Sequence, residues 1–201
     1  MRPGSTPLGV DGDTAGAGAL NRLTEAVAAI LDTGGDVDIV TARIAAAMTD
    51  ELQQPDLFPL FAGRRKSFAA YVDPLRHFIV HCSVHEPEHL TEAHDHGEAW
   101  AVYGVLRGSS RYRRFRRSDD VAPGTATLVC ERDDELVPGQ TDVVLPGYVH
   151  LIGNETDEPA WNVVVRPRPI EEVWRRRYDL DSGAYVIHPG SLPDGVAAPS
   201  A

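Results

Sequence analysis

The sequence predicts a mainly β fold, a barrel or a sandwich, preceded by two helices. From about Arg76 onward, short runs of apolar or alternating residues follow one another, and each is long enough for a strand. Turn signals rich in Gly and Pro separate these runs, and this pattern is typical of antiparallel barrels and sandwiches. The predicted strands are Phe78–Val84, Ala99–Leu106, Arg111–Arg117, Thr125–Glu131, Thr141–Leu145, Val149–Ile152 and Trp161–Arg166.

Two amphipathic helices are expected ahead of the strands. Apolar residues recur at helical spacing over Leu20–Leu31, and Gly34-Gly35 ends this helix. A second helix is expected from Asp36 to Leu52, because Pro55 prevents its continuation. We expect both helices to pack on the outside of the β-structure; a helical module that binds a partner is the alternative. A further short helix is predicted over Ile170–Tyr178.

One catalytic domain is expected in the 201 residues. Residues 1–18 are rich in Gly, Pro, Ser and Thr and are expected to be disordered, since they bury too little apolar surface to offset ordering. Residues 19–56 should form the helical part of the same domain, residues 57–188 the barrel with a C-terminal extension, and residues 189–201 a loose tail.

Composition limits the partners. The formal net charge of -11 argues against nucleic acid or an anionic membrane, because both attract basic surfaces. No apolar stretch of the kind found in signal peptides precedes Gly18, and no run is long enough to span a membrane, so we expect a cytoplasmic protein. Cys82 and Cys130 lie in apolar runs and are expected to be buried thiols. A monomer or a small homo-oligomer is expected.

The basic run Arg111–Arg117 contains two aromatic residues, so binding of nucleic acid has to be considered. Pairing in a hairpin with Thr125–Glu131 would place Glu131 opposite Arg111, and opposite charges across strands stabilise such pairs. Asp119 and Asp120 would lie near Arg117. We therefore favour a solvated, charge-paired strand or a subunit contact.

His94-Asp95-His96 is the most informative motif, because side chains at positions i and i+2 of a strand share one face. Two imidazoles can then point at one metal ion, and His150 on a facing strand can supply a third. Three nitrogen ligands leave neighbouring coordination positions open, as a catalytic metal requires.

The wider pattern resembles the cupin superfamily. His94, His96 and Gly108 match its first half-motif, and Gly139, Gly147, His150 and Asn154 match its second. From Arg76 to Pro169 the chain is most similar to the cysteine dioxygenase-like thiol dioxygenases, because His94–Gly97 leads into Val105–Gly108 at that family's spacing. The resemblance implies a cupin β-barrel of the jelly-roll type, with His94, His96 and His150 as ligands of Fe(II). Ligand type alone would also admit Zn, Ni, Mn or Co.

Three departures distinguish the chain from that family. Ala101 occupies the position of a glutamate ligand in many cupins and of a crosslinking cysteine in animal-type cysteine dioxygenases, so we expect no cysteine–tyrosine crosslink. The family's Ser-x-His-x-Tyr run falls on Asn162, Val164 and Arg166. Its carboxylate-binding arginine falls near Phe68, although Arg64 and Arg65 lie close by.

The resemblance implies a dioxygenase that adds O2 to the sulfur of a small thiol and gives a sulfinate. Alternation along the last predicted strand directs Arg166 and Asn162 toward the metal, where Arg166 can bind a substrate carboxylate bidentately; a surface salt bridge is the alternative. Tyr103 can offer its hydroxyl to the substrate, or it is a core tyrosine. Two other functions stay open: a metal-dependent cupin isomerase, hydrolase or carbon–carbon dioxygenase, and a non-catalytic cupin that binds a small molecule.

Overall fold

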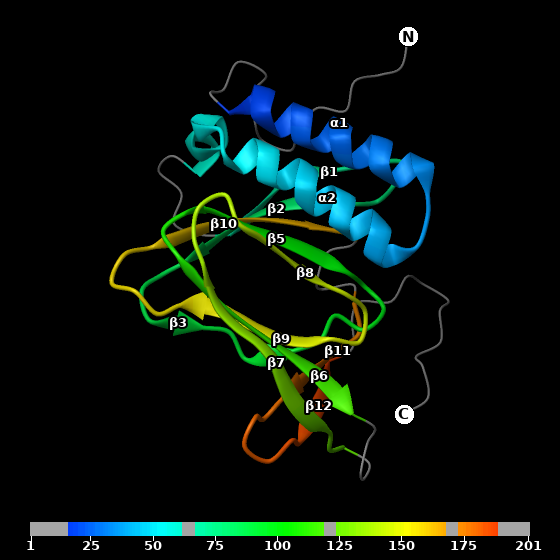
Figure 1. Cartoon of the computed structure of the whole chain (residues 1–201), viewed down its shortest axis with the longest axis vertical. Helices are drawn as coiled ribbons and strands as arrows, with labels where there is room; N and C mark the ends of the chain where they lie inside the picture. Colours follow the sequence, from blue (N-terminus) through cyan, green and yellow to red (C-terminus); the bar gives the residue numbers. More distant parts are fainter. Residues whose placement is uncertain (1–15, 62–66, 119–123, 168–172, 189–201) are drawn as a thin grey trace.

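The chain folds into two antiparallel β-sheets with its helices on one side (Figure 1). The computed structural model describes residues 16–61, 67–118, 124–167 and 173–188. The helices are α1 (Ala17–Thr33), α2 (Val37–Leu52) and the 3-10 helix η1 (Pro55–Phe61). The strands are β1 (Phe68–Val72), β2 (Ile79–His85), β3 (His89–Leu90), β4 (Ala93–His94), β5 (Ala101–Arg107), β6 (Ser110–Ser118), β7 (Thr127–Leu136), β8 (Thr141–Val144), β9 (Val149–Asn154), β10 (Ala160–Arg166), β11 (Arg175–Tyr178) and β12 (Tyr185–His188).

The two sheets face each other in an arrangement of the jelly-roll type. The first sheet has five strands in the order β1-β2-β10-β5-β8. The second has seven strands, in the order β12-β11-β4-β9-β6-β7 with β3 added beside β9. No strand ladder joins the two sheets within the described ranges, so the barrel is open along its edges. The mainly β fold predicted from the sequence is confirmed.

The N-terminal helices cover the outer face of the first sheet (Figure 1). Leu20, Leu23 and Val27 of α1 and Ile44 and Met48 of α2 are fully buried and join the core on that face. The approach of α2 to β5 is close because Gly104 lacks a side chain: a Cβ there would lie 2.3 Å from Cδ1 of Leu52. The expected packing of the helices outside the β-structure is therefore confirmed.

Strand alternation divides the first sheet into two chemically different faces. Val80, Cys82 and Val163 point toward the helices and are buried there, and Trp100 and Trp161 pack against the same core. The other face looks into the space between the sheets and carries His81, Ser83 and His85 on β2, Ala101, Tyr103 and Val105 on β5, and Asn162, Val164 and Arg166 on β10. The candidate site residues predicted on β5 and β10 thus belong to the inner face.

Three local predictions were wrong. Arg175–Tyr178 forms strand β11 in place of the C-terminal part of a helix, whereas residues 170–172 lie outside the described residues. The hairpin pairs in another register than expected, with a bulge between Arg114 and Phe115, and Glu135 rather than Glu131 lies opposite Arg111. Cys130 is exposed on β7, while Cys82 is buried; both are free thiols.

The basic strand is nevertheless paired with acidic residues. Nε of Arg111 donates to Asp133 at 2.6 Å, and Nε of Arg116 donates to Glu131 at 2.8 Å. Asp119 and Asp120 lie outside the described residues. These contacts agree with the predicted charge-paired strand. Among the described helices, none is long and apolar enough to cross a membrane.

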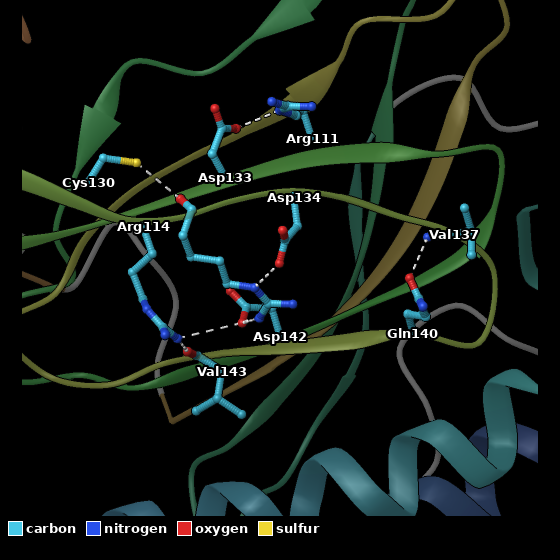
Figure 2. Close-up of polar contacts among 10 residues, drawn as sticks. Arg111, Arg114, Cys130, Asp133, Asp134, Val137, Gln140, Asp142 and Val143 are labelled. Carbon is cyan, nitrogen blue, oxygen red and sulfur yellow. Dashed lines mark hydrogen bonds and ion pairs between the residues drawn. The ribbon is translucent and has the colours of Figure 1, made fainter.

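An ion-pair network bridges one open edge between the sheets (Figure 2). Asp142 on β8 is buried and bound by Nη1 of Arg132 on β7, with Nη1 of Arg114 on β6 at 3.7 Å. Arg114 also donates to the carbonyl of Val143 at 3.2 Å. Burial raises the pKa of the Asp142 carboxyl, and the two guanidinium groups oppose that shift. Here charge pairing replaces the strand hydrogen bonds that a closed barrel would make.

Asp142→Ala should lower the free energy of unfolding by about 1–3 kcal/mol, because it leaves two partly buried guanidinium groups without their shared carboxylate. Urea denaturation measures the change. Asp134→Ala is the matched control: Asp134 also accepts from Arg132, at 2.6 Å, but is exposed, so the loss should stay below about 1 kcal/mol. Equal losses in the two variants would contradict a bridging role for Asp142.

Candidate metal centre

Three histidines from two distant parts of the chain meet between the two sheets. His94 on β4 lies directly opposite His150 on β9 in an antiparallel pair. His96 follows two residues after His94, just beyond the end of β4. The two histidines of the His-x-His motif therefore do not both lie in a strand, yet their rings approach within 5.2 Å, centroid to centroid.

The distances between the three imidazoles fit one metal ion. Nε2 of His96 lies 3.3 Å from Nε2 of His94 and 3.2 Å from Nε2 of His150. Potential ligand atoms of all three residues lie within 4.8 Å of one another. Two nitrogens that are each about 2.1 Å from one ion in tetrahedral or octahedral geometry lie about 3.0–3.4 Å apart. The two separations that involve His96 fall in this range.

The protonation states also suit a metal. His94 donates from Nδ1 to the carbonyl of Glu92 at 2.8 Å, which leaves the lone pair of Nε2 directed at the other two rings. Burial lowers the pKa of His94, and it lowers the pKa values of His96 and His150 well below the ordinary value. Three neutral imidazoles with converging lone pairs can hold one divalent ion and leave its other coordination positions free.

Asp95, between two of these histidines, anchors them to the C-terminal strand. Its carboxylate is 2% exposed and accepts hydrogen bonds from the backbone N–H of Arg176 and the hydroxyl of Tyr178, both at 2.8 Å. It also accepts from the backbone N–H of Gly97 at 3.2 Å. Strand β11 therefore fixes the loop that carries His96.

Tyr178→Phe should weaken metal binding about 10-fold, because Asp95 loses a hydrogen bond that orients the ligand loop, and outer contacts of this kind contribute about 10- to 100-fold. Competition with a chromophoric chelator measures the affinity. Tyr185→Phe, on the same hairpin, is the control and should change the affinity less than about 2-fold by the same reasoning. A Tyr178→Phe protein that binds metal as tightly as the wild type would show that β11 does not position the ligands.

A cavity of about 430 Å³ opens beside His94. Tyr103, Val164 and Arg166 line it, and the Tyr103 hydroxyl lies 3.4 Å from Nε2 of His96. Burial raises the pKa of Tyr103, so its hydroxyl stays protonated. Arg166 is only 9% exposed, and its charge helps to lower the pKa of His96. The structure therefore places Tyr103 and Arg166 beside the three histidines.

Asn162 lies elsewhere on the inner face. It is 0% exposed, accepts a hydrogen bond from the hydroxyl of Ser110 at 3.1 Å, and does not belong to the residues that line the cavity. Contact between Asn162 and a substrate stays a prediction. Arg64 and Arg65, which lie near the position of the family's carboxylate-binding arginine, are outside the described residues.

The cavity also contains residues that the sequence did not indicate. Arg175 and Arg177 come from β11, which was expected to be helical, and Arg177 donates to Glu92 at 2.8 Å. His81, Ser83 and His85 come from β2, which ends at His85, one residue beyond the predicted strand Phe78–Val84. Their spacing of two was visible in the sequence, but the extent of β2 was not.

The chain is similar to known proteins only in the comparison with solved structures. No family model and no curated protein matches the chain. A protein from Thermus thermophilus is similar at 22% identity and a TM-score of 0.41, covering 53% of this chain and 89% of its own. A sugar phosphate isomerase of a cupin superfamily from Silicibacter pomeroyi is similar at 20% identity and a TM-score of 0.40; the match covers 59% of this chain and 72% of the isomerase. A Cupin_2 domain of an XRE family transcriptional regulator from Enterobacter cloacae is similar at 15% identity and a TM-score of 0.39; the match covers 51% of this chain and 95% of that domain.

These similar proteins include cupins of unlike function, and fold does not determine function. At these identities and TM-scores we transfer no activity from them. The function is therefore argued from the residues of the site.

Proposed function

We propose that this protein is a metal-dependent oxidoreductase, an Fe(II) dioxygenase that adds O2 to the sulfur of a small anionic thiol. The observation that carries the proposal is the set of three neutral imidazoles beside a cavity that Arg166 lines, with Nε2 of His96 3.3 Å from that of His94 and 3.2 Å from that of His150. Three neutral ligands leave the charge of a divalent ion uncompensated, which favours an anionic ligand such as a thiolate.

The reaction balances without a further reductant. The thiol loses its proton and both atoms of O2 are transferred to sulfur, so that sulfur gives up four electrons, O2 accepts four, and the product is a sulfinate. The metal, when bound, supplies the reactivity toward O2. Selecting Fe(II) rather than Zn, Ni, Mn or Co is part of the proposal, because imidazole ligands accept all of these.

The protein's own groups bind and orient the substrate. Arg166, buried at the end of β10, offers two parallel N–H donors to a carboxylate. The Tyr103 hydroxyl, 3.4 Å from Nε2 of His96, can donate a hydrogen bond to a group bound beside the histidines. Val164 and Ile152 supply the apolar part of the lining. A bound substrate would then be held by its sulfur at one end and by its carboxylate at the other.

A second candidate is a metal-dependent cupin of another reaction class, such as an isomerase or a hydrolase. A specific observation favours it: 11 of the 13 residues that line the cavity carry a polar or charged side chain, whereas most small-molecule sites are lined chiefly by apolar residues. Such a lining suits a very hydrophilic substrate, with or without sulfur. Ala101, which is fully buried on β5, supplies no fourth ligand in either case.

The test starts with protein purified without added metal, whose metal content is determined. The Fe(II)-loaded protein is then screened by oxygen electrode against small thiols and their sulfur-free counterparts, with His150→Ala as the inactive control. We expect O2 uptake with anionic thiols and a product heavier by two oxygen atoms. Turnover of sulfur-free substrates without O2 uptake would replace this proposal with the second candidate.

A further inference from the structure

The wall of the cavity formed by β2 carries a hydrogen-bonded pair that the proposed reaction does not use. Oγ of Ser83 lies 2.8 Å from Nε2 of His85, and both residues line the same cavity as His94 and Arg166. Ser83 lies opposite Asn162 on the neighbouring strand β10, and paired residues point to the same face of a sheet. Ser83 therefore faces the space between the sheets. His85 is 6% exposed, so this is a built contact rather than a solvated surface pair.

The His85 imidazole is uncharged at neutral pH. Burial foremost, and then the neighbouring His89 and His81, lower its pKa to about 4. A neutral imidazole can hold the Ser83 hydroxyl as donor or acceptor, depending on its tautomer. The β2 wall therefore offers hydrogen bonds without a net charge.

Cationic side chains line the cavity from both sheets: Arg166 lies on β10, next to β2, and Arg175 and Arg177 lie on β11 in the other sheet. Glu92 is the one acidic residue among the described residues that line it. Glu92 accepts from Arg177 at 2.8 Å, and its side chain is 68% exposed. This concentration of positive charge lies in a chain with a formal net charge of -11, and a divalent metal would increase it further.

We propose that Ser83, held by His85, is a specificity-determining residue that binds an uncharged hydroxyl of the substrate, and that the cavity rejects substrates with an ammonium group. This inference deepens the proposed function: the substrate class is a hydroxylated thiol acid rather than an amino acid thiol. An ammonium group would share the cavity with three guanidinium groups and a metal ion, while the carboxylate of Glu92 is paired with Arg177, and like charges in a partly enclosed site repel one another. A hydroxyl gains a hydrogen bond at no such cost.

Three thiol acids that differ at one position test the proposal: 3-mercaptopropionate, 3-mercaptolactate and cysteine carry hydrogen, hydroxyl and ammonium there. Each is titrated calorimetrically into Zn(II)-loaded protein, which binds thiolates without redox chemistry. We expect 3-mercaptolactate to bind about 3- to 10-fold more tightly than 3-mercaptopropionate. Cysteine should bind at least about 10-fold more weakly than 3-mercaptopropionate.

Two variants test whether Ser83 and His85 cause the preference for the hydroxylated compound. Ser83→Ala should reduce the advantage of 3-mercaptolactate over 3-mercaptopropionate to about 1-fold, and His85→Gln should reduce it in part, since it frees the serine hydroxyl. Ser118→Ala, on the exposed end of β6, is the matched control and should preserve the ratio. Cysteine binding as tightly as the other two, or a ratio that Ser83→Ala leaves intact, would overturn the proposal.

The outcome is separable from that of the proposed function. Binding order is measured without O2, so it holds even for a protein that proves inactive as a dioxygenase. Were the protein to bind no metal, the same three compounds titrated into metal-free protein should keep the same order with lower affinity, because both walls of the cavity belong to the protein. A reversed order there would contradict the inference.

Discussion

His150→Ala should remove most of the bound metal and lower the metal affinity by more than about 100-fold, beyond the loss typical of a residue that only orients a ligand. His150 is 1% exposed, and its Nε2 lies 3.2 Å from that of His96, so its loss leaves two imidazoles around the ion. Metal content after dialysis, together with competition against a chelator, measures the effect. His94→Ala and His96→Ala should behave in the same way.

His188→Ala provides the control, because His188 lies on β12 and is not one of the three convergent histidines. It should retain the metal content of the wild type. Circular dichroism of each variant separates loss of metal from loss of fold. A folded His150→Ala protein with the metal content of the wild type would refute the assignment of the metal centre.

Arg166→Met should lower kcat/KM about 10- to 150-fold for an anionic substrate, mainly through a raised KM. The expected loss is about 1.5–3 kcal/mol, the range for a hydrogen bond to a charged group. The methionine retains much of the volume of the side chain, so the buried end of β10 should remain packed. Steady-state kinetics with the substrate from the oxygen-uptake screen measures the change.

Two further variants separate charge from geometry at this position. Arg166→Lys keeps the positive charge but loses the paired N–H donors, so its KM should lie between those of the wild type and Arg166→Met. Arg116→Met removes an exposed guanidinium that pairs with Glu131 at 2.8 Å, and it should leave kcat/KM unchanged. Wild-type kinetics in Arg166→Met would move substrate recognition to another residue, first Arg175.

The sequence was sufficient for the fold class because its local signals agree with one another. The helical spacing of Leu20, Leu23 and Val27 and the alternation on β5 and β10 each follow from burial of one face, which leaves a period in the sequence. The period does not mark which residues of two strands lie opposite each other, and that prediction failed: Arg111 lies opposite Glu135, four residues beyond the expected Glu131. Cys130 is exposed because β7 is an edge strand, and edge position has no local signal.

The sequence by itself also determined the three convergent histidines, because His94 and His96 are two residues apart and the Gly-rich segment around His150 matches the second half-motif. Only the tertiary structure decided what surrounds them. The pairing of β11 with β4 brings Arg175, Arg177 and Tyr178 to the ligand loop, and the pairing of β2 with β10 brings Ser83 and His85 to the cavity. Both pairings join segments about 80 residues apart, as the partners Arg177 and His94 and the partners Asn162 and Ser83 illustrate. Strand pairing depends on complementary buried faces rather than on local sequence, so the residues that select the substrate could be identified only once the sheets were formed.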